Sequence, residues 1–311
     1  MKRKMMYGWL ATMLVAATLF MGCGAQQETV APKEETVAEE DTQDSAKESE
    51  ETASQIASGD ETVEAVEVVE DGMQPITADR LVDGSYDIVV DSSSEMFSID
   101  AATLTVADGK MTCDMTMGGT GYLYLFMGTG EEAVAAEESD YVAFTEDADG
   151  IHHFVVPVES LDSGIPCAAF SKRKEKWYER TLCFRSDALP LDAFVEGTYD
   201  TVASLKLADG TYTVDAALQG GSGKASITSP ATLTVADGKA TLTVEWSSSN
   251  YDYMLVGEEK YLPVNTEGNS VFEIPVEAFN YRMAVVADTT AMSKPHEIAY
   301  HITLDSASIA Q

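Results

Sequence analysis

The nine residues ATLTVADGK at positions 102–110 return letter for letter at 231–239. In each copy an apolar–polar alternation leads into Asp-Gly, and the alternation resumes directly after it. A period of two indicates a strand with one covered face, and Asp-Gly between two such runs is a strong signal for a tight hairpin turn. The stretch therefore predicts the same β-hairpin twice.

Other phrases recur in the same order around this hairpin. LVDGSYDIVV at 81–90 returns as LADGTYTVDA at 207–216, and FVVPVESL at 154–161 returns as FEIPVEAF at 272–279. A repeat that keeps its order while only the loop lengths differ indicates two homologous domains.

Each repeat is predicted to be all-β. Short alternating runs are separated by Gly, Asp and Asn turns, and no long run has a period of 3.6. Seven or so short strands in roughly 110 residues are typical of an immunoglobulin-like β-sandwich. We expect two tandem sandwiches, at 76–190 and 191–306, followed by a C-terminal tail at 307–311.

The N-terminus has the features of an export signal. A basic start precedes an apolar run from Met5 to Phe20 and the pair Gly22-Cys23. This arrangement resembles a bacterial lipoprotein signal. The resemblance implies that residues 1–22 are a signal peptide, that Cys23 carries lipid, and that the protein is anchored to the outer face of the cell membrane. An ordinary signal peptide or an uncleaved anchor is the alternative.

Residues 23–75 are predicted to form a disordered acidic tether. The segment is rich in Glu, Asp, Ala, Ser and Thr and contains no aromatic residue, so it cannot bury enough apolar surface to fold. The whole chain has 53 acidic and 19 basic residues and a net charge of −34. A nucleic-acid partner is excluded on this ground, because phosphate neutralisation requires Lys and Arg.

The three cysteines other than Cys23 all lie in the first repeat, at Cys113, Cys167 and Cys183. If the residues around Cys167 and Cys183 form a hairpin, these two thiols can face each other, and an exported location permits a disulfide. The alternative is two buried thiols that fill core space.

A cluster of basic residues lies between these two cysteines, in SKRKEKWYER at 171–180. Such a cluster in a very acidic protein can attract an anion or an acidic partner, with aromatic side chains beside it for contact. The alternative is a solvated hairpin tip. The candidate partner-binding residues are Lys172, Arg173, Lys174, Lys176, Trp177 and Tyr178.

The last predicted strand, HEIAYHITL at 296–304, has His296 and Tyr300 on its covered face. The order of strands and turn phrases in each repeat resembles the NEAT domain, an immunoglobulin-like module of Gram-positive surfaces that often binds haem. The resemblance implies a haem site on this hairpin, where His296 occupies the position of the iron-ligating tyrosine and Tyr300 that of the second tyrosine. The other candidate residues for the same pocket are Tyr251, Tyr253, Met254 and Met283. The alternative is that Tyr300 is a core residue and His296 lies at the start of the strand.

No catalytic motif is found in the sequence, and a non-enzymatic role is predicted. The first hypothesis is a surface lipoprotein that captures haem or iron and relays it to an importer. The second is a surface adhesion or scaffold protein whose sandwiches bind a protein partner through the basic turn. A third is an accessory subunit that docks onto a membrane transporter.

Overall fold

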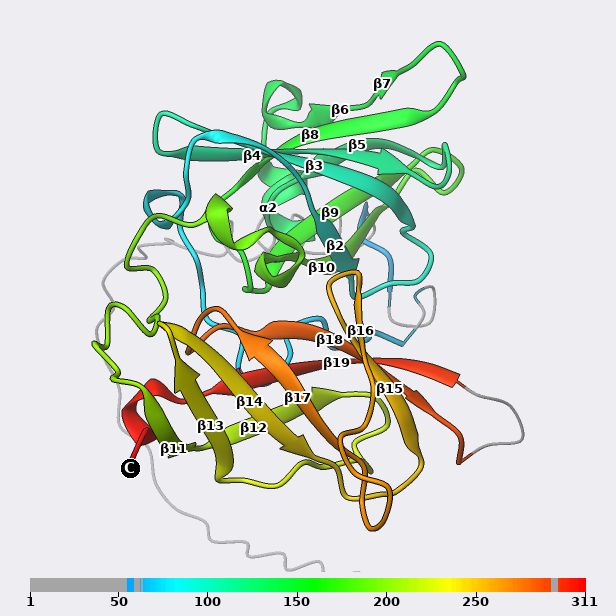
Figure 1. Ribbon diagram of the computed structural model, residues 1–311. Helices are drawn as coiled ribbons and strands as arrows, with labels where there is room; N and C mark the ends of the chain where they lie inside the picture. Colours follow the sequence, from blue (N-terminus) through cyan, green and yellow to red (C-terminus); the bar gives the residue numbers. More distant parts are fainter. Residues whose placement is uncertain (1–54, 59–61, 63, 292–295) are drawn as a thin grey trace, which may run out of the picture. The chain divides into compact units, whose positions relative to one another are not determined.

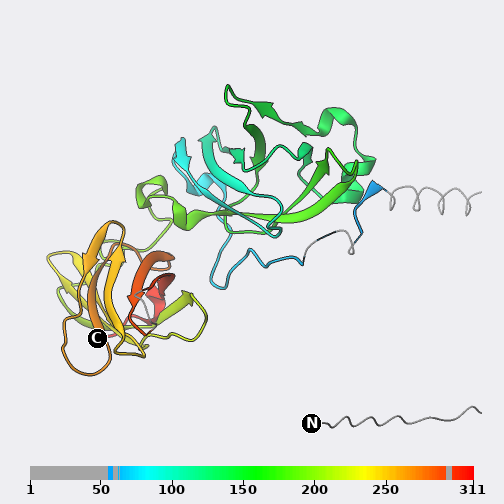
Figure 2. The same cartoon turned by 90° about the vertical axis from the view of Figure 1, so that its right-hand side faces the viewer.

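The structure is almost entirely β (Figure 1). The computed structural model describes most of the chain beyond the N-terminal segment, namely residues 55–58, 62, 64–291 and 296–311. The strands form four antiparallel sheets, and no sheet combines strands from residues 84–185 with strands from residues 210–304. These two sets of strands are separate groups in Figure 1 and in the turned view of Figure 2. The predicted all-β class is confirmed.

The first repeat contributes two sheets. One has the order β1 (Gly84–Asp87), β3 (Ile99–Ala107), β4 (Lys110–Met117), β8 (His152–Val158) and β7 (Thr145–Glu146). The other has the order β2 (Val89–Ser92), β10 (Trp177–Arg185), β9 (Ile165–Ser171), β5 (Tyr122–Phe126) and β6 (Val142–Ala143).

The second repeat has the same strand order. One of its sheets consists of β11 (Gly210–Val214), β13 (Ala231–Ala236), β14 (Lys239–Glu245) and β17 (Val271–Val276). The other consists of β12 (Ala216–Gly220), β19 (His296–Leu304), β18 (Met283–Thr289), β15 (Tyr251–Val256) and β16 (Glu259–Tyr261). Strand by strand, β10 and β9 of the first repeat therefore correspond to β19 and β18 of the second.

The repeated Asp-Gly forms the same turn in both copies. Asp108 and Gly109 have φ angles of 52° and 71°, and Asp237 and Gly238 have φ angles of 51° and 73°. Two successive positive φ angles are the signature of the type I′ turn, whose twist matches that of the flanking strands. The turns join β3 to β4 and β13 to β14, as the alternation predicts.

Each pair of sheets encloses its own apolar core. Leu104 of β3 and Leu182 of β10 are fully buried in one cluster, and Leu233 of β13 and Ile302 of β19 are fully buried in another. Burial of such a side chain stabilises the fold by roughly 1.5–3 kcal/mol. Both halves are thus β-sandwich-like, and strands such as β13 alternate between core and surface.

The segment before the first sheet is more ordered than the sequence predicts. Val68 and Met73 pack against Cys183, on the face of β10 that points away from the first core. Further upstream, the amide of Ala57 donates to the carbonyl of Trp177 at 2.8 Å. The prediction of a structureless tether up to residue 75 is wrong for these residues. The predicted signal peptide, the predicted lipidation site Cys23 and the predicted tether up to residue 54 lie outside the described residues.

From residue 64 onward, the helical elements that the structure describes are short: α2 (Gly130–Ala135) and the 3₁₀ turns η2 (Ala78–Arg80), η3 (Glu138–Asp140), η4 (Ser186–Ala188), η5 (Leu191–Ala193) and η6 (Ser306–Ser308). Within the described part of the chain, no helix is long and apolar enough to cross a membrane. The predicted C-terminal tail is attached to the second repeat, because Ala310 exchanges two backbone hydrogen bonds with Thr213 of β11.

Candidate functional site

A cavity of about 690 Å³ lies at one end of the first repeat, beside the β9–β10 hairpin. Its walls come from the upstream segment at Ala57, Thr62 and Ala65, from the β2–β3 connection, from the start of β5, from β10 and from the basic turn. The lining includes Tyr122, Arg173, Lys174, Tyr178, Glu179 and Arg180. The cavity therefore combines aromatic walls with cationic groups.

Arg180 is the buried cation of this cavity, with 6% of its surface exposed. Its guanidinium carbon lies 4.3 Å from the ring centroid of Phe97 and 4.9 Å from that of Tyr122. The Nη2 atom donates to the Tyr178 carbonyl at 2.9 Å, and Nη1 approaches the Tyr122 hydroxyl at 3.5 Å. The buried Nε has no hydrogen-bond partner among the described residues. All of these described neighbours are neutral.

The basic turn beside the cavity is a tight hairpin tip. Its geometry is fixed by Glu175, which has a φ of 53°, and by the Lys172 amide, which donates to the Gly121 carbonyl at 2.9 Å. Arg173 and Lys174 are exposed and line the cavity, as does the half-buried Tyr178. Of the six predicted partner-binding residues, these three meet at one site.

Trp177 does not form the predicted exposed platform. It is 3% exposed and packs in a small cluster with Ala133 and Ala168, its ring centroid 4.9 Å from that of Tyr141. The cover is provided by α2, whose N-terminal Gly130 amide donates to the Glu179 carboxylate at 2.6 Å. The platform prediction is wrong because a turn of helix covers this face of β10.

In the second repeat, Tyr300 occupies the position of Arg180. Both are the first of three alternating buried residues on the last strand, followed by Leu182 and Phe184 in one repeat and by Ile302 and Leu304 in the other. Tyr122 and Tyr251 also correspond, since they pair with Ser171 and Thr289 at the same place in their sheets.

The second repeat fills this position with aromatic rings. Tyr300 is 3% exposed, and its hydroxyl lies 3.3 Å from that of Tyr251. The Trp246 ring stacks on Tyr251 at 4.0 Å and meets Tyr300 edge-on at 5.2 Å. Burial, followed by the hydrogen bond with Tyr251, raises the pKa of the Tyr300 phenol. These rings form part of the second core.

The predicted haem residues are only partly brought together. Tyr251, Met254 and Tyr300 are buried in the second core, where the Trp246 indole N–H lies 3.4 Å from the Met254 sulfur. His296 is exposed at the start of β19, opposite Thr289.

The remaining two predicted haem residues, Tyr253 and Met283, lie near opposite ends of β18. The Tyr253 hydroxyl donates to Glu297 at 2.6 Å. Met283 pairs with Ile302, at the other end of β18 from the Thr289–His296 pair. Six residues along a strand span about 20 Å, so His296 and Met283 do not line one pocket.

The predicted disulfide is not formed, and Cys113, Cys167 and Cys183 are free, buried thiols. The register of the hairpin pairs Cys167 with Arg180. Cys183 is three residues further along β10 and therefore points to the opposite face, where its sulfur lies 3.8 Å from that of Met73. Burial raises the pKa of each thiol to about 12. The structure therefore agrees with the alternative prediction, in which both thiols are buried and fill core space.

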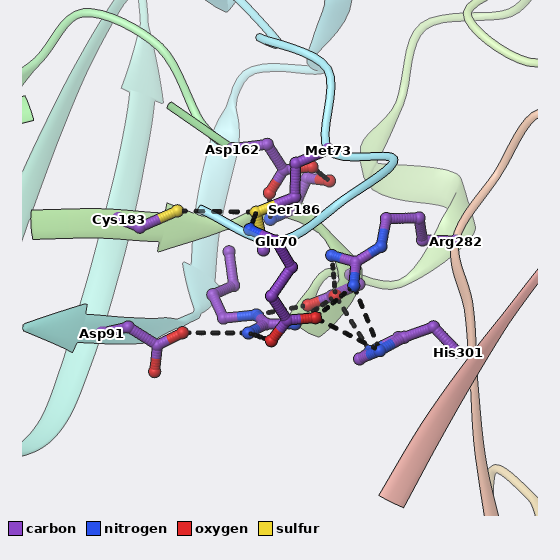
Figure 3. Close-up of polar contacts among 10 residues, drawn as sticks. Glu70, Met73, Asp91, Asp162, Cys183, Ser186, Arg282 and His301 are labelled. Carbon is purple, nitrogen blue, oxygen red and sulfur yellow. Dashed lines mark hydrogen bonds and ion pairs between the residues drawn. The ribbon is translucent and has the colours of Figure 1, made fainter. Parts of the chain in front are cut away.

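A partly buried ionic cluster, which sequence reasoning missed, joins residues from both repeats (Figure 3). Arg185 forms ion pairs with Glu70 at 2.8 Å, Asp91 at 2.9 Å and Asp187 at 2.7 Å. Asp187 also contacts Arg282 at 3.1 Å and the His301 Nε2 at 3.0 Å. Arg282 in turn contacts Glu70.

The charges in this cluster shift one another's pKa values. Burial alone would raise the pKa of Asp187, but the hydrogen bond from His301 and the bonds and charge of Arg185 hold it well below its usual range. Burial would also raise the pKa of Glu70, and the two arginines lower it. Among the described residues, no group of three or more His, Cys, Asp or Glu side chains is arranged to hold a metal ion. The cluster is therefore an ion-pair network.

A scan against protein-family models found no family that matches the chain, and a search of curated proteins found no similar sequence. The resemblance to NEAT domains thus rests on the residues alone, and the functional argument depends on the cavity of the first repeat.

Proposed function

We propose that this chain is a non-catalytic binding protein of the cell surface, built from two immunoglobulin-like, NEAT-like sandwich domains. In this proposal residues 1–22 direct export, lipid on Cys23 anchors the protein to the membrane, and the first repeat captures a ligand that is passed to an importer. The observation that carries it is the difference between the repeats. The first has a cavity lined by Tyr122 and Arg180, where the second packs Tyr251 and Tyr300 together.

Haem is the ligand that the family resemblance implies, and the residues of the cavity fit it. Tyr122 and Tyr178 offer aromatic surface and phenol oxygens, and phenolate is a known ligand of haem iron. Arg173, Lys174 and Arg180 offer positive charge for the two carboxylates of haem. When bound, haem would supply the iron that is relayed. The exposed His296 of the second repeat is the alternative iron ligand, which the same experiment tests.

The test is a haem titration of residues 24–311, which contain every described residue, followed by the Soret band. We expect one saturable site that is weakened by Tyr178→Phe and unchanged by His296→Ala. Loss of the band in His296→Ala alone would move the site to the second repeat. If the protein takes up no more haem than an unrelated acidic protein, haem is not the ligand.

The alternative function is a surface adhesion or scaffold protein, and the exposed basic turn favours it. Lys172, Arg173 and Lys174 all project from the hairpin tip of a chain with a net charge of −34. A partner with an acidic surface fits this turn. Charge reversal of the exposed Lys172, which does not line the cavity, would then abolish partner binding and leave any haem uptake unchanged.

A further inference from the structure

Arg180 differs from the other buried arginines of the described structure. Arg185 contacts three carboxylates and Arg282 contacts two, so both are neutralised by the surrounding acids. Arg180 is 6% exposed, and its described hydrogen-bond partners are a carbonyl and a hydroxyl. A buried guanidinium in this position has positive charge that no described side chain balances.

Such a charge is unfavourable in a protein interior unless something compensates for it. The rings of Phe97 and Tyr122 offset part of the desolvation through cation–π contacts. The repeated fold does not require a cation here, because the second repeat has the neutral Tyr300 at the corresponding position. The charge of Arg180 is therefore specific to the repeat that has the cavity.

The surroundings of Arg180 favour an anion. Arg173 and Lys174 line the same cavity, and the carboxylate of Glu179, which also borders it, is held by the Gly130 amide at 2.6 Å. Converging positive groups raise the local concentration of anions even when the whole molecule is acidic. Tyr122 and Tyr178 add aromatic walls around this charge.

We propose that the first-repeat cavity binds a small amphiphilic anion: an aromatic or apolar body with a carboxylate, sulfonate or phosphate group that pairs with Arg180. This inference rests on the proposed function, because it takes the cavity as the ligand site. It adds that the negative charge of the ligand determines binding, so a metal in the ligand is not required.

The experiment compares two fluorescent probes on residues 24–311 at about 0.15 M salt. The anionic probe is 8-anilinonaphthalene-1-sulfonate, and the neutral probe is N-phenyl-1-naphthylamine, which has the same aromatic body without the sulfonate. We expect one saturable site for the anionic probe and binding of the neutral probe that is weaker by about ten-fold or more, as is typical of a charge-assisted contact.

Variants connect this preference to Arg180. Arg180→Gln should weaken binding of the anionic probe by about ten- to a hundred-fold and leave binding of the neutral probe unchanged. Arg180→Lys should be intermediate, because lysine keeps the charge without the planar fork. Lys110→Gln is the matched control, since it removes one positive charge from the exposed β3–β4 turn of the same repeat and should change nothing.

The outcomes separate the two proposals. Equal binding of both probes, or an Arg180→Gln variant that binds like the parent, would overturn the anion site and leave a ligand cavity in place. Binding of neither probe would overturn the cavity as a ligand site as well. Anionic-probe binding without haem uptake would support the anion site and reject haem. Should Arg180→Gln fail to fold, the comparison of the two probes on the unaltered protein still decides.

Discussion

At the scale of single residues, the role of Arg180 can be separated from structural support by comparing two buried arginines. The described hydrogen-bond partners of Arg180 are neutral, whereas Arg185 contacts the carboxylates of Glu70, Asp91 and Asp187. Removing one partner of a buried ion pair leaves charges uncompensated, but removing an unbalanced charge relieves the structure. The same substitution should therefore have opposite consequences at the two positions.

We predict that Arg180→Met leaves the free energy of unfolding unchanged or raises it by about 1 kcal/mol, at the expense of ligand binding. The control, Arg185→Met, should lower it by about 3–5 kcal/mol. Urea unfolding followed by tryptophan fluorescence measures both. If Arg180→Met destabilises the protein as strongly as Arg185→Met, Arg180 is a structural residue and the case for an anion site is lost.

At the scale of elements, the repeated type I′ turn gives a prediction that can be checked in duplicate. Gly109 and Gly238 have φ angles of 71° and 73°, and a Cβ at either position would meet nothing within 4 Å. An alanine there should cost about 1 kcal/mol through its conformation alone, equally in both repeats.

The comparison uses Gly109→Ala, Gly238→Ala and the control Gly119→Ala, whose Cβ would also meet nothing within 4 Å and whose φ is not positive. Urea midpoints should fall for the first two and stay constant for the third. If Gly109→Ala leaves the urea midpoint unchanged, the turn relaxes to another type at no cost, contrary to the register of β3 and β4.

These turns also show what the sequence can predict and why. The hairpins are specified locally, by alternation and by a residue pair that tolerates positive φ, so they were predictable. The register of β9 against β10 was not predictable in this way. The basic turn shifts the pairing so that Cys167 meets Arg180, and such a shift changes which face each side chain occupies.

Contacts that join distant parts of the chain were also beyond sequence reasoning. Val68 and Met73 belong to an acidic stretch that also contains Val66 and Val69, and the sequence does not show that these residues cover a face of β10. The cavity lies where the two repeats differ, since Arg180 of the first repeat takes the place of Tyr300 of the second. Comparison of the two repeats, position by position, was the signal that could have found it.

At the scale of the whole molecule, the ionic cluster links the upstream segment, the first repeat and the second repeat through Glu70, Asp187 and His301. The folded-state pKa values of Asp187 and Glu70 lie below their ordinary values. Groups of this kind contribute stability above their unfolded-state pKa, near 4, and that contribution is lost as the pH falls through the folded-state values.

We therefore predict that the free energy of unfolding is constant from pH 7 to about pH 5 and falls steeply below about pH 4. Asp187→Asn should lower it by about 3–5 kcal/mol at pH 7, because Arg185 and Arg282 lose a shared carboxylate. The same variant should show a smaller decline in the free energy of unfolding in acid, since the neutral amide has no charge to lose.

The exposed Asp83→Asn is the control and should follow the parent at every pH. Urea unfolding at a series of pH values measures all three proteins. Parallel pH profiles for Asp187→Asn and the parent would mean that acid acts elsewhere and that this cluster does not hold the repeats together.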